Sequence, residues 1–360
     1  MKTIFILVYD ITLIGGAEKV AINMANEFAK ISNVYLISFF NKNKSPMSEV
    51  DESVNVIYLS DKPRSLTLHH FYFSRKLRSY VKKFSPTSIL GITAGMNSII
   101  LSSALGLNVN KVYAEHSNLL NNHYGFKHKF RQFLGAKYFN YVVSLTSDDR
   151  DEFINKFKIS DQKAIKIYNW IEPIEKESAY IPNNKIVSVG RLVKVKGYDH
   201  LLEVAKYLKE NCSFSWDIYG DGPERESISN KIIDYDLESH VFIKGAITNV
   251  DSVLSDYCLF VSTSFFEGLP LSFLEARNHN LPIVSFNCPT GPKEIVNHGV
   301  DGILVEPYDT KKMADEIKLL LEDKNTMIKL SNTIALSRSK FSKESIMKDW
   351  KKILLGESNG

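Results

Sequence analysis

Short apolar, β-branched runs alternate with helical patterns along both halves of the chain. The clearest strand-like runs are residues 3–8, 34–38, 88–92, 141–145 and 186–189. Strands that alternate with helices form parallel sheets with helices on both faces. The chain has 360 residues, more than one hydrophobic core usually holds, so the sequence predicts two doubly wound α/β domains.

A polar, proline-marked stretch at residues 171–184 is typical of a hinge between domains. We therefore expect one domain over residues 1–172 and a second over residues 173–340. A further helical pattern at residues 341–356 follows the second domain. No repeat of solenoid length accompanies these segments.

Cysteine usage and hydropathy indicate where such a chain works. The three cysteines, Cys212, Cys258 and Cys288, are odd in number and lack the spacing of metal ligands. This pattern favours a reducing compartment and argues against zinc. No apolar run approaches the length of a membrane span, so we expect a cytoplasmic protein.

Two carboxylates, Glu267 and Glu275, stand eight positions apart across a predicted loop-to-helix junction. Gly268 loosens the loop and Pro270 suits the first helical position. The free N–H groups at a helix start suit a phosphate, while the carboxylates could hold sugar and ribose hydroxyls. An acidic surface helix would give the same spacing by chance.

Two cations, Arg191 and Lys196, lie just beyond the strand-like run that ends near Gly190. Arginine can bind phosphate oxygens with two hydrogen bonds, and lysine supplies a compact charge. Together they could stabilise a departing diphosphate. The alternative is a solvated basic loop.

Three other strand-like runs also end in polar or glycine-rich residues. Gly16 follows the first run, His116 follows the run at 112–114, and Gly220 and Gly222 follow the run at 216–219. Ligands of parallel sheets bind at the carboxyl ends of the strands, where all these residues fall. Tight turns and a structural histidine are the alternatives.

In combination, these motifs resemble the retaining glycosyltransferases of family 4 (glycosyl transferases group 1), of the kind that build bacterial envelope polysaccharides. The resemblance covers nearly the whole chain. It implies the GT-B fold, with an acceptor-binding Rossmann-like domain at 1–172, onto which the helix at 341–356 packs back. The nucleotide-sugar-binding domain would be residues 173–340.

The resemblance also implies roles for individual residues. Catalytic roles would fall to His116, Arg191, Lys196 and Glu267, with Glu267 positioning the transferred sugar and His116 contacting it. Other donor-binding residues would be Gly16, Gly190, Gly220, Gly222, Gly268, Leu269 and Glu275, the last of which would hold ribose. Neither a metal nor another cofactor would be needed. The chain has Thr290-Gly291-Pro292 where many relatives have a glycine pair.

The implied reaction moves a sugar from a nucleotide diphosphate, most simply UDP, to a carbohydrate or polyprenyl-diphosphate-linked acceptor in O-antigen or capsule synthesis. The resemblance favours attack from the same face as the leaving group. Two alternatives stay open: a nucleotide-sugar 2-epimerase, and a catalytically silent nucleotide-binding partner of another transferase. The charged set Arg191, Lys196, Glu267 and Glu275 fits transfer better than either.

Cations interleave with aromatic residues at 64–83 and at 123–138. This composition suits an anionic membrane surface, so we expect peripheral contact with the inner face of the plasma membrane. Ordinary amphipathic helices with solvated basic faces would look the same. No nucleic-acid recognition motif accompanies these clusters, so we expect no nucleic-acid partner.

Overall fold

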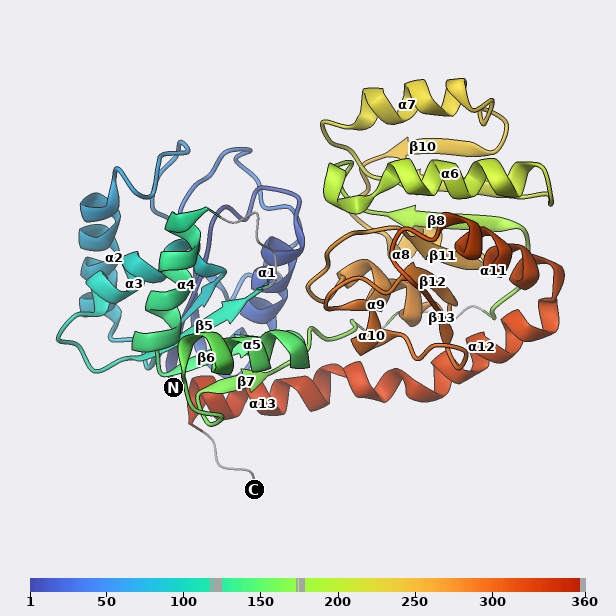
Figure 1. The fold of residues 1–360 in the computed structure, drawn as a ribbon. Helices are drawn as coiled ribbons and strands as arrows, with labels where there is room; N and C mark the ends of the chain where they lie inside the picture. The colour runs from blue at the N-terminus through green and yellow to red at the C-terminus, as the bar shows by residue number, and fades with distance from the viewer. Residues whose placement is uncertain (117–118, 120–124, 173, 175–178, 357–360) are drawn as a thin grey trace. The chain divides into compact units, whose positions relative to one another are not determined.

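The computed structural model describes residues 1–116, 119, 125–172, 174 and 179–356. Ser117, Asn118, His123, Tyr124 and most of the stretch at 173–178 therefore lie outside the described residues. The chain divides into two compact units, each of which is described by itself (Figure 1). Unit 1 consists of Met1–Asn169 and Ile346–Gly360, and unit 2 of Trp170–Ser345.

Unit 1 contains a seven-stranded parallel sheet in the order β3-β2-β1-β4-β5-β6-β7. The strands are β1 (Thr3–Val8), β2 (Asn33–Ser38), β3 (Asn55–Tyr58), β4 (Ser88–Ile92), β5 (Asn110–Glu115), β6 (Tyr141–Ser144) and β7 (Ala164–Lys166). The helices between them are α1 (Gly16–Ala29), α2 (His70–Phe84), the 3₁₀ helix η1 (Ala94–Met96), α3 (Asn97–Ala104), α4 (Phe126–Tyr138) and α5 (Ser147–Phe157).

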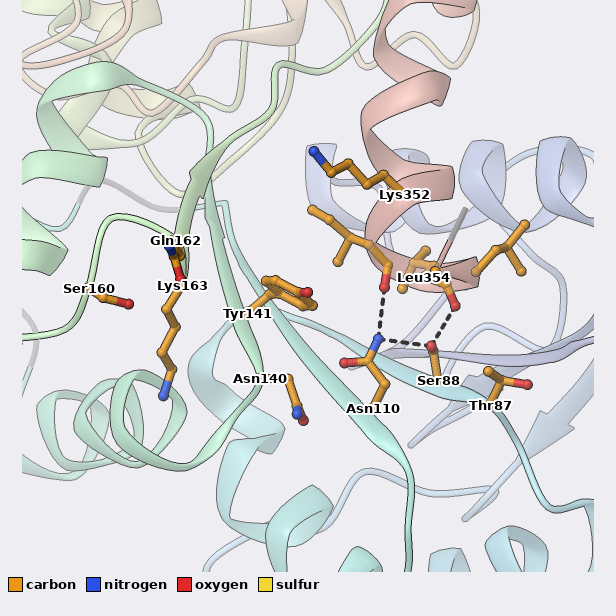
Figure 2. A pocket seen from close by; sticks show the side chains of 13 residues that line it. Thr87, Ser88, Asn110, Asn140, Tyr141, Ser160, Gln162, Lys163, Lys352 and Leu354 are labelled. Atoms are coloured by element: carbon orange, nitrogen blue, oxygen red, sulfur yellow. Dashed lines mark hydrogen bonds between the residues drawn. The ribbon is translucent and has the colours of Figure 1, made fainter. Parts of the chain in front are cut away.

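The last helix, α13 (Lys343–Leu355), joins unit 1 at the amino ends of its strands. The Ser88 hydroxyl, at the start of β4, donates a 2.6 Å hydrogen bond to the carbonyl of Leu354. The Asn110 amide, at the start of β5, donates a 2.8 Å bond to the carbonyl of Ile353 (Figure 2). Side chains from the sheet thus satisfy carbonyls that the helix end leaves without an internal partner.

Unit 2 contains a six-stranded parallel sheet in the order β10-β9-β8-β11-β12-β13. The strands are β8 (Lys185–Val189), β9 (Ser215–Tyr219), β10 (Val241–Gly245), β11 (Leu259–Ser262), β12 (Ile283–Phe286) and β13 (Gly302–Val305). The helices are η2 (Lys194–Lys196), α6 (Tyr198–Lys209), α7 (Arg225–Asp234), α8 (Asp251–Leu254), α9 (Leu271–Asn278), α10 (Pro292–Ile295), α11 (Thr310–Glu322), α12 (Lys324–Ser337) and η3 (Arg338–Phe341).

Each unit has its own hydrophobic core. In unit 1 the rings of Phe5, Phe73 and Phe153 are fully buried, and in unit 2 Trp216 and Met313 are. The expectation of two doubly wound parallel sheets is confirmed. Among the described residues, no helix combines the length and the apolar character needed to cross a bilayer.

Both sheets reverse their strand order at one point. In unit 1 this switch lies between β1 and β4, and in unit 2 between β8 and β11. Open parallel sheets bind ligands outside the carboxyl ends of the strands at such a switch. The residues that follow β1, β4, β8 and β11 are therefore the first candidates for a site.

Candidate functional site

The first part of the site in unit 2 is the turn that follows β8. Arg191 is exposed on this turn, and among the described residues its side chain has no hydrogen-bond or ion-pair partner. Lys196 ends η2, and Gly197 then adopts φ +64° and begins the turn into α6. A Cβ on Gly197 would lie 2.1 Å from the carbonyl oxygen of Thr263, just beyond β11. Only glycine therefore lets this turn lie against the end of β11.

Lys196 and Glu267 form an ion pair, with 2.6 Å between Nζ and Oε1. Their side chains are only 23% and 10% exposed, so solvent screens the pair incompletely. The Lys196 chain passes beside Gly190, where a Cβ would lie 3.4 Å from Cε. The Tyr198 hydroxyl donates to the Gly190 carbonyl at 2.9 Å, and burial, then Glu267, raises the pKa of Tyr198.

A second loop holds Glu267 from the other side. The Glu267 N–H donates to the carbonyl of Pro289 at 3.1 Å, and the Thr290 N–H donates to the carbonyl of Glu267 at 3.0 Å. A Cβ on Gly291 would lie 1.8 Å from the Gly268 carbonyl oxygen, so only glycine allows this approach. Thr290-Gly291-Pro292, which departs from the family pattern, therefore keeps the one glycine that the packing requires.

Cys288 lies in the same loop and is 2% exposed. Burial, then the charge of Glu267, raises the pKa of its thiol to about 12, against an opposing effect of Lys196. The thiol is therefore protonated at neutral pH and unsuited to act as a nucleophile.

Glu275 is half-buried in α9. The sequence predicts Pro270 at the first helical position, whereas in the structure Pro270 is the N-cap and the helix begins at Leu271. Arg277 anchors the helix through a buried 2.9 Å ion pair with Asp301 and a 3.0 Å bond to the carbonyl of Ile295. Glu275 thus lies on a rigid support.

Gly220 and Gly222 follow β9 and pack against the turn after β8. A Cβ on Gly220 would lie 1.9 Å from the Gly190 carbonyl oxygen, and one on Gly222 would lie 2.4 Å from that of Leu192. Close backbone packing accounts for both glycines without a ligand. Any contact with donor remains a prediction.

In unit 1 the candidate residues lie at the carboxyl ends of β1 and β5. Gly16 is exposed at the first position of α1. His116 is half-buried overall, yet its Nε2 is enclosed and has no hydrogen-bond partner within the described part of the chain. Burial lowers the pKa of His116 to about 4, so the ring is neutral at pH 7.

Sequence reasoning missed Asp10, which follows β1 and is 1% exposed. Its carboxylate accepts from the N–H and hydroxyl of Thr12, at 3.0 and 2.6 Å, and from the N–H of Lys42 at 3.1 Å. The carboxylate therefore fixes the loop that leads to α1. The signal in the sequence is a charged residue two positions beyond an apolar strand.

The structure thus brings together Gly190, Lys196 and Glu267, and places Gly268 against the loop after β12. Arg191 and Glu275 belong to the same unit. Among the described residues, no group of three or more His, Cys, Asp or Glu side chains is placed to hold a metal ion.

Two doubly wound parallel α/β units, one with paired charges beside its switch point, have the architecture of the GT-B class. The model described as "Glycosyltransferase Family 4" matches residues 14–174, and "Glycosyl transferases group 1" matches residues 172–335. The chain belongs to this family of glycosyltransferases and is an enzyme.

Individual relatives agree with this assignment. An "Uncharacterized glycosyltransferase" of Haemophilus influenzae is 29% identical over 98% of this chain and 100% of its own length. The "GalNAc-alpha-(1->4)-GalNAc-alpha-(1->3)-diNAcBac-PP-undecaprenol alpha-1,4-N-acetyl-D-galactosaminyltransferase" of Campylobacter jejuni is 24% identical over 96% of both chains. The crystal structure of Anabaena HepE with UDP-glucose aligns with a TM-score of 0.83 at 17% identity, over 99% of this chain and 100% of HepE.

Proposed function

We propose that the enzyme moves a sugar from a UDP-sugar to a hydroxyl of a carbohydrate or polyprenyl-diphosphate-linked acceptor during assembly of a bacterial surface polysaccharide. The observation that carries this proposal is the Lys196–Glu267 pair beside the switch point of unit 2. The UDP-glucose complex of HepE and the undecaprenol-linked acceptor in the name of the Campylobacter enzyme support the donor and the acceptor.

The pair suits the chemistry of transfer because each member has a partner in the donor. When the bond between the anomeric carbon and the phosphate oxygen breaks, the electron pair leaves with UDP and its diphosphate gains negative charge. Lys196 and the exposed Arg191 would stabilise that charge. As the diphosphate draws Lys196 away, a Glu267 oxygen becomes available to accept a hydrogen bond from the transferred sugar.

Other residues would bind the remaining parts of the donor. Glu275 would hold the ribose hydroxyls, and the backbone at Gly268 and Leu269 would bind the donor. Around the diphosphate and nucleoside, Gly190, Gly220 and Gly222 would allow close approach. For unit 1 we propose that His116 binds a sugar hydroxyl and that Gly16 contacts a phosphate oxygen.

The transferred sugar would keep its anomeric configuration, with the acceptor entering on the face from which UDP leaves. Two cations that take up the diphosphate charge would make a divalent metal unnecessary. Proton NMR of the product gives the anomeric configuration, and an inverted product would contradict the proposal. Loss of transfer in EDTA, restored by Mg²⁺ or Mn²⁺, would refute metal independence.

The test of function is incubation with radiolabelled UDP-sugars and a bacterial membrane extract. Label moving into the lipid or polysaccharide fraction supports transfer. Conversion of the free nucleotide sugar would indicate a 2-epimerase instead. If UDP binds but neither transfer nor conversion occurs, the protein would be a catalytically silent partner. A glutamine at position 267 is the matched inactive control, because Glu267→Gln keeps the size of the side chain and removes its charge.

We further propose that unit 1 contacts an anionic membrane through α2, α3 and α4. These three helices contain no Asp or Glu. Phe71 and Phe126 are each 83% exposed, and Phe130 is 49% exposed. Beside Phe126 and Phe130 lies a cavity of about 460 Å³, which Lys127 and Arg131 also line. Each near-surface cation would contribute about 1 kcal/mol to binding an anionic bilayer.

Flotation with liposomes tests this contact. We expect the enzyme to float with phosphatidylglycerol liposomes at low salt and to stay behind with neutral phosphatidylcholine. Replacing Phe126 and Phe130 by alanine should weaken flotation without changing UDP binding. An enzyme that fails to float with anionic liposomes at low salt would contradict the proposal.

A further inference from the structure

Thr93, the residue after β4, has a backbone conformation that side chains rarely adopt. Its φ is +75° and its ψ is 156°, a region occupied almost only by glycine. Ser85 and Lys158 also have positive φ, but they are left-handed caps at the ends of α2 and α5, a common helix ending. Thr93 ends a strand, and β-branching makes its conformation more costly.

The surrounding structure holds Thr93 in place without using its side chain. The Thr93 N–H donates to the carbonyl of Ala114 at 2.8 Å, which continues the pairing of β4 with β5. Its hydroxyl does not cap η1 and forms no hydrogen bond with another of the described residues. Strained residues whose side chains do not help to hold the fold together are found mainly at binding and active sites.

The position of Thr93 agrees with that reading. β4 lies at the switch point of unit 1, between β1 and β5. Leu7 of β1 pairs with Gly91 of β4. Tyr9 and Thr93 each lie two positions beyond these paired residues, so they occupy matching positions just past the ends of the two strands. Tyr9 is 41% exposed, and its ring packs edge-on against the buried ring of Phe40, with 4.9 Å between the centroids. On the other side, His116 follows β5, and its enclosed Nε2 has no hydrogen-bond partner among the residues that the structure describes.

We propose that Tyr9 and Thr93 form a subsite for a pyranose ring of the acceptor. The Tyr9 ring stacks on the apolar face of the sugar, and the Thr93 hydroxyl hydrogen-bonds one of its hydroxyls. An aromatic face beside a few polar groups at a switch point is the chemistry that recognises a sugar. The subsite rests on the proposed function, because it puts the acceptor beside His116, the proposed contact of the transferred sugar.

The experiment measures binding of methyl glycosides to the full chain in saturating UDP. The probes are the methyl α-glycosides of glucose, galactose, N-acetylglucosamine and N-acetylgalactosamine, detected by saturation-transfer NMR. We expect at least one glycoside to bind. Thr93→Val, Thr93→Gly and Tyr9→Ala should each weaken its binding by about five- to tenfold, the loss of one net interaction. Thr93→Ser should keep binding, because it keeps the hydroxyl.

Two controls separate the subsite from a structural effect. UDP affinity, measured by calorimetry, should be the same in all variants. The melting temperature of Thr93→Gly should equal or exceed that of the wild type, because glycine adopts this backbone without strain. Lys158→Gly relieves a positive φ elsewhere in unit 1 and should leave glycoside binding unchanged.

The outcomes distinguish failure of the acceptor subsite from failure of the proposed function. If UDP binds but no glycoside does, or if the Thr93 and Tyr9 variants bind glycoside as the wild type does, the subsite is wrong and the proposed function stands. If UDP itself does not bind, the proposed function fails and the subsite fails with it.

Discussion

Lys196 and Glu267 neutralise each other before any ligand arrives, and this sets what substitution at either residue does. The pair is largely withdrawn from solvent. Removing one member therefore leaves the other as a partly buried charge without its partner, a costlier change than breaking a surface pair. Function and stability have to be measured separately at this site.

Replacing Lys196 by alanine should lower kcat by about 10²- to 10³-fold, because the leaving diphosphate loses a charge that stabilises the transition state. Steady-state kinetics with the labelled UDP-sugar measures the effect, and circular dichroism checks the fold. Lys194→Ala is the control, since Lys194 is an exposed lysine two positions earlier. Wild-type turnover in Lys196→Ala would remove Lys196 from the mechanism.

His116 should make stability depend on pH. Its pKa is lowered from 6.5 to about 4 by burial, so between these values the unfolded chain binds the proton more readily than the folded one. The part of the unfolding free energy that depends on a neutral His116 is fully present above pH 6.5. It is lost by about 1.4 kcal/mol per pH unit as the pH falls towards 4. Urea unfolding from pH 7 to 4.5 measures it.

Comparison with His116→Gln isolates this effect, because glutamine can form hydrogen bonds but does not titrate in this range. The difference in unfolding free energy between wild type and variant should change with pH only below pH 6.5. A difference that stays constant down to pH 4.5 would show that the imidazole takes up its proton as easily in the folded protein as in the unfolded chain.

At the residue scale, the sequence predicts which polar residues lie at the ends of strands. Arg191, Lys196 and His116 stand out because polar residues follow apolar runs. Tyr198 and Cys288 do not stand out, since their relation to Glu267 depends on loops that are distant in sequence and meet only after folding. The φ of Thr93 is hidden for the same reason, because neighbouring strands impose it.

At the scale of the elements, the loop after β11 and the loop after β12 are joined to each other, because backbone hydrogen bonds connect Glu267 with Pro289 and Thr290. The strands themselves follow from β-branched runs, and the run at 88–92 matches β4 residue for residue. The joining of the two loops does not follow from any pattern, since it depends on β11 and β12 lying side by side.

Gly291→Ala should separate these loops, because the added Cβ would lie 1.8 Å from the Gly268 carbonyl oxygen. We expect the affinity for UDP-sugar to fall by about tenfold or more, with the rest of the fold retained. Isothermal calorimetry measures it. Gly125→Ala is the control, since no atom of the described residues lies within 4 Å of a Cβ there. Equal affinity in both variants would show that the loops do not shape the donor site.

At the level of the whole molecule, α13 provides buried contacts that unit 1 cannot obtain from its first 169 residues. Trp350 is 2% exposed and Leu354 is fully buried. The helical pattern is visible in the sequence. That this helix packs on the first unit is expected only from the family resemblance, because periodicity shows that a helix has an apolar face and not which surface will cover it.

Trp350→Ala should lower the free energy of unfolding by about 3–5 kcal/mol, the usual cost of removing a large buried ring. Urea denaturation followed by circular dichroism measures it. Asp349→Ala, an exposed change one residue earlier, should cost less than about 0.5 kcal/mol. Equal effects of the two substitutions would show that α13 is not part of the folded core.

The return of α13 to unit 1 has a consequence during synthesis. The ribosome makes residues 1–169 first, yet the segment that completes this unit begins only at residue 346. Every residue of unit 2 must leave the exit tunnel before unit 1 can close. A nascent chain halted anywhere before residue 346 therefore carries an incomplete first unit, in which the surface that α13 later covers is exposed.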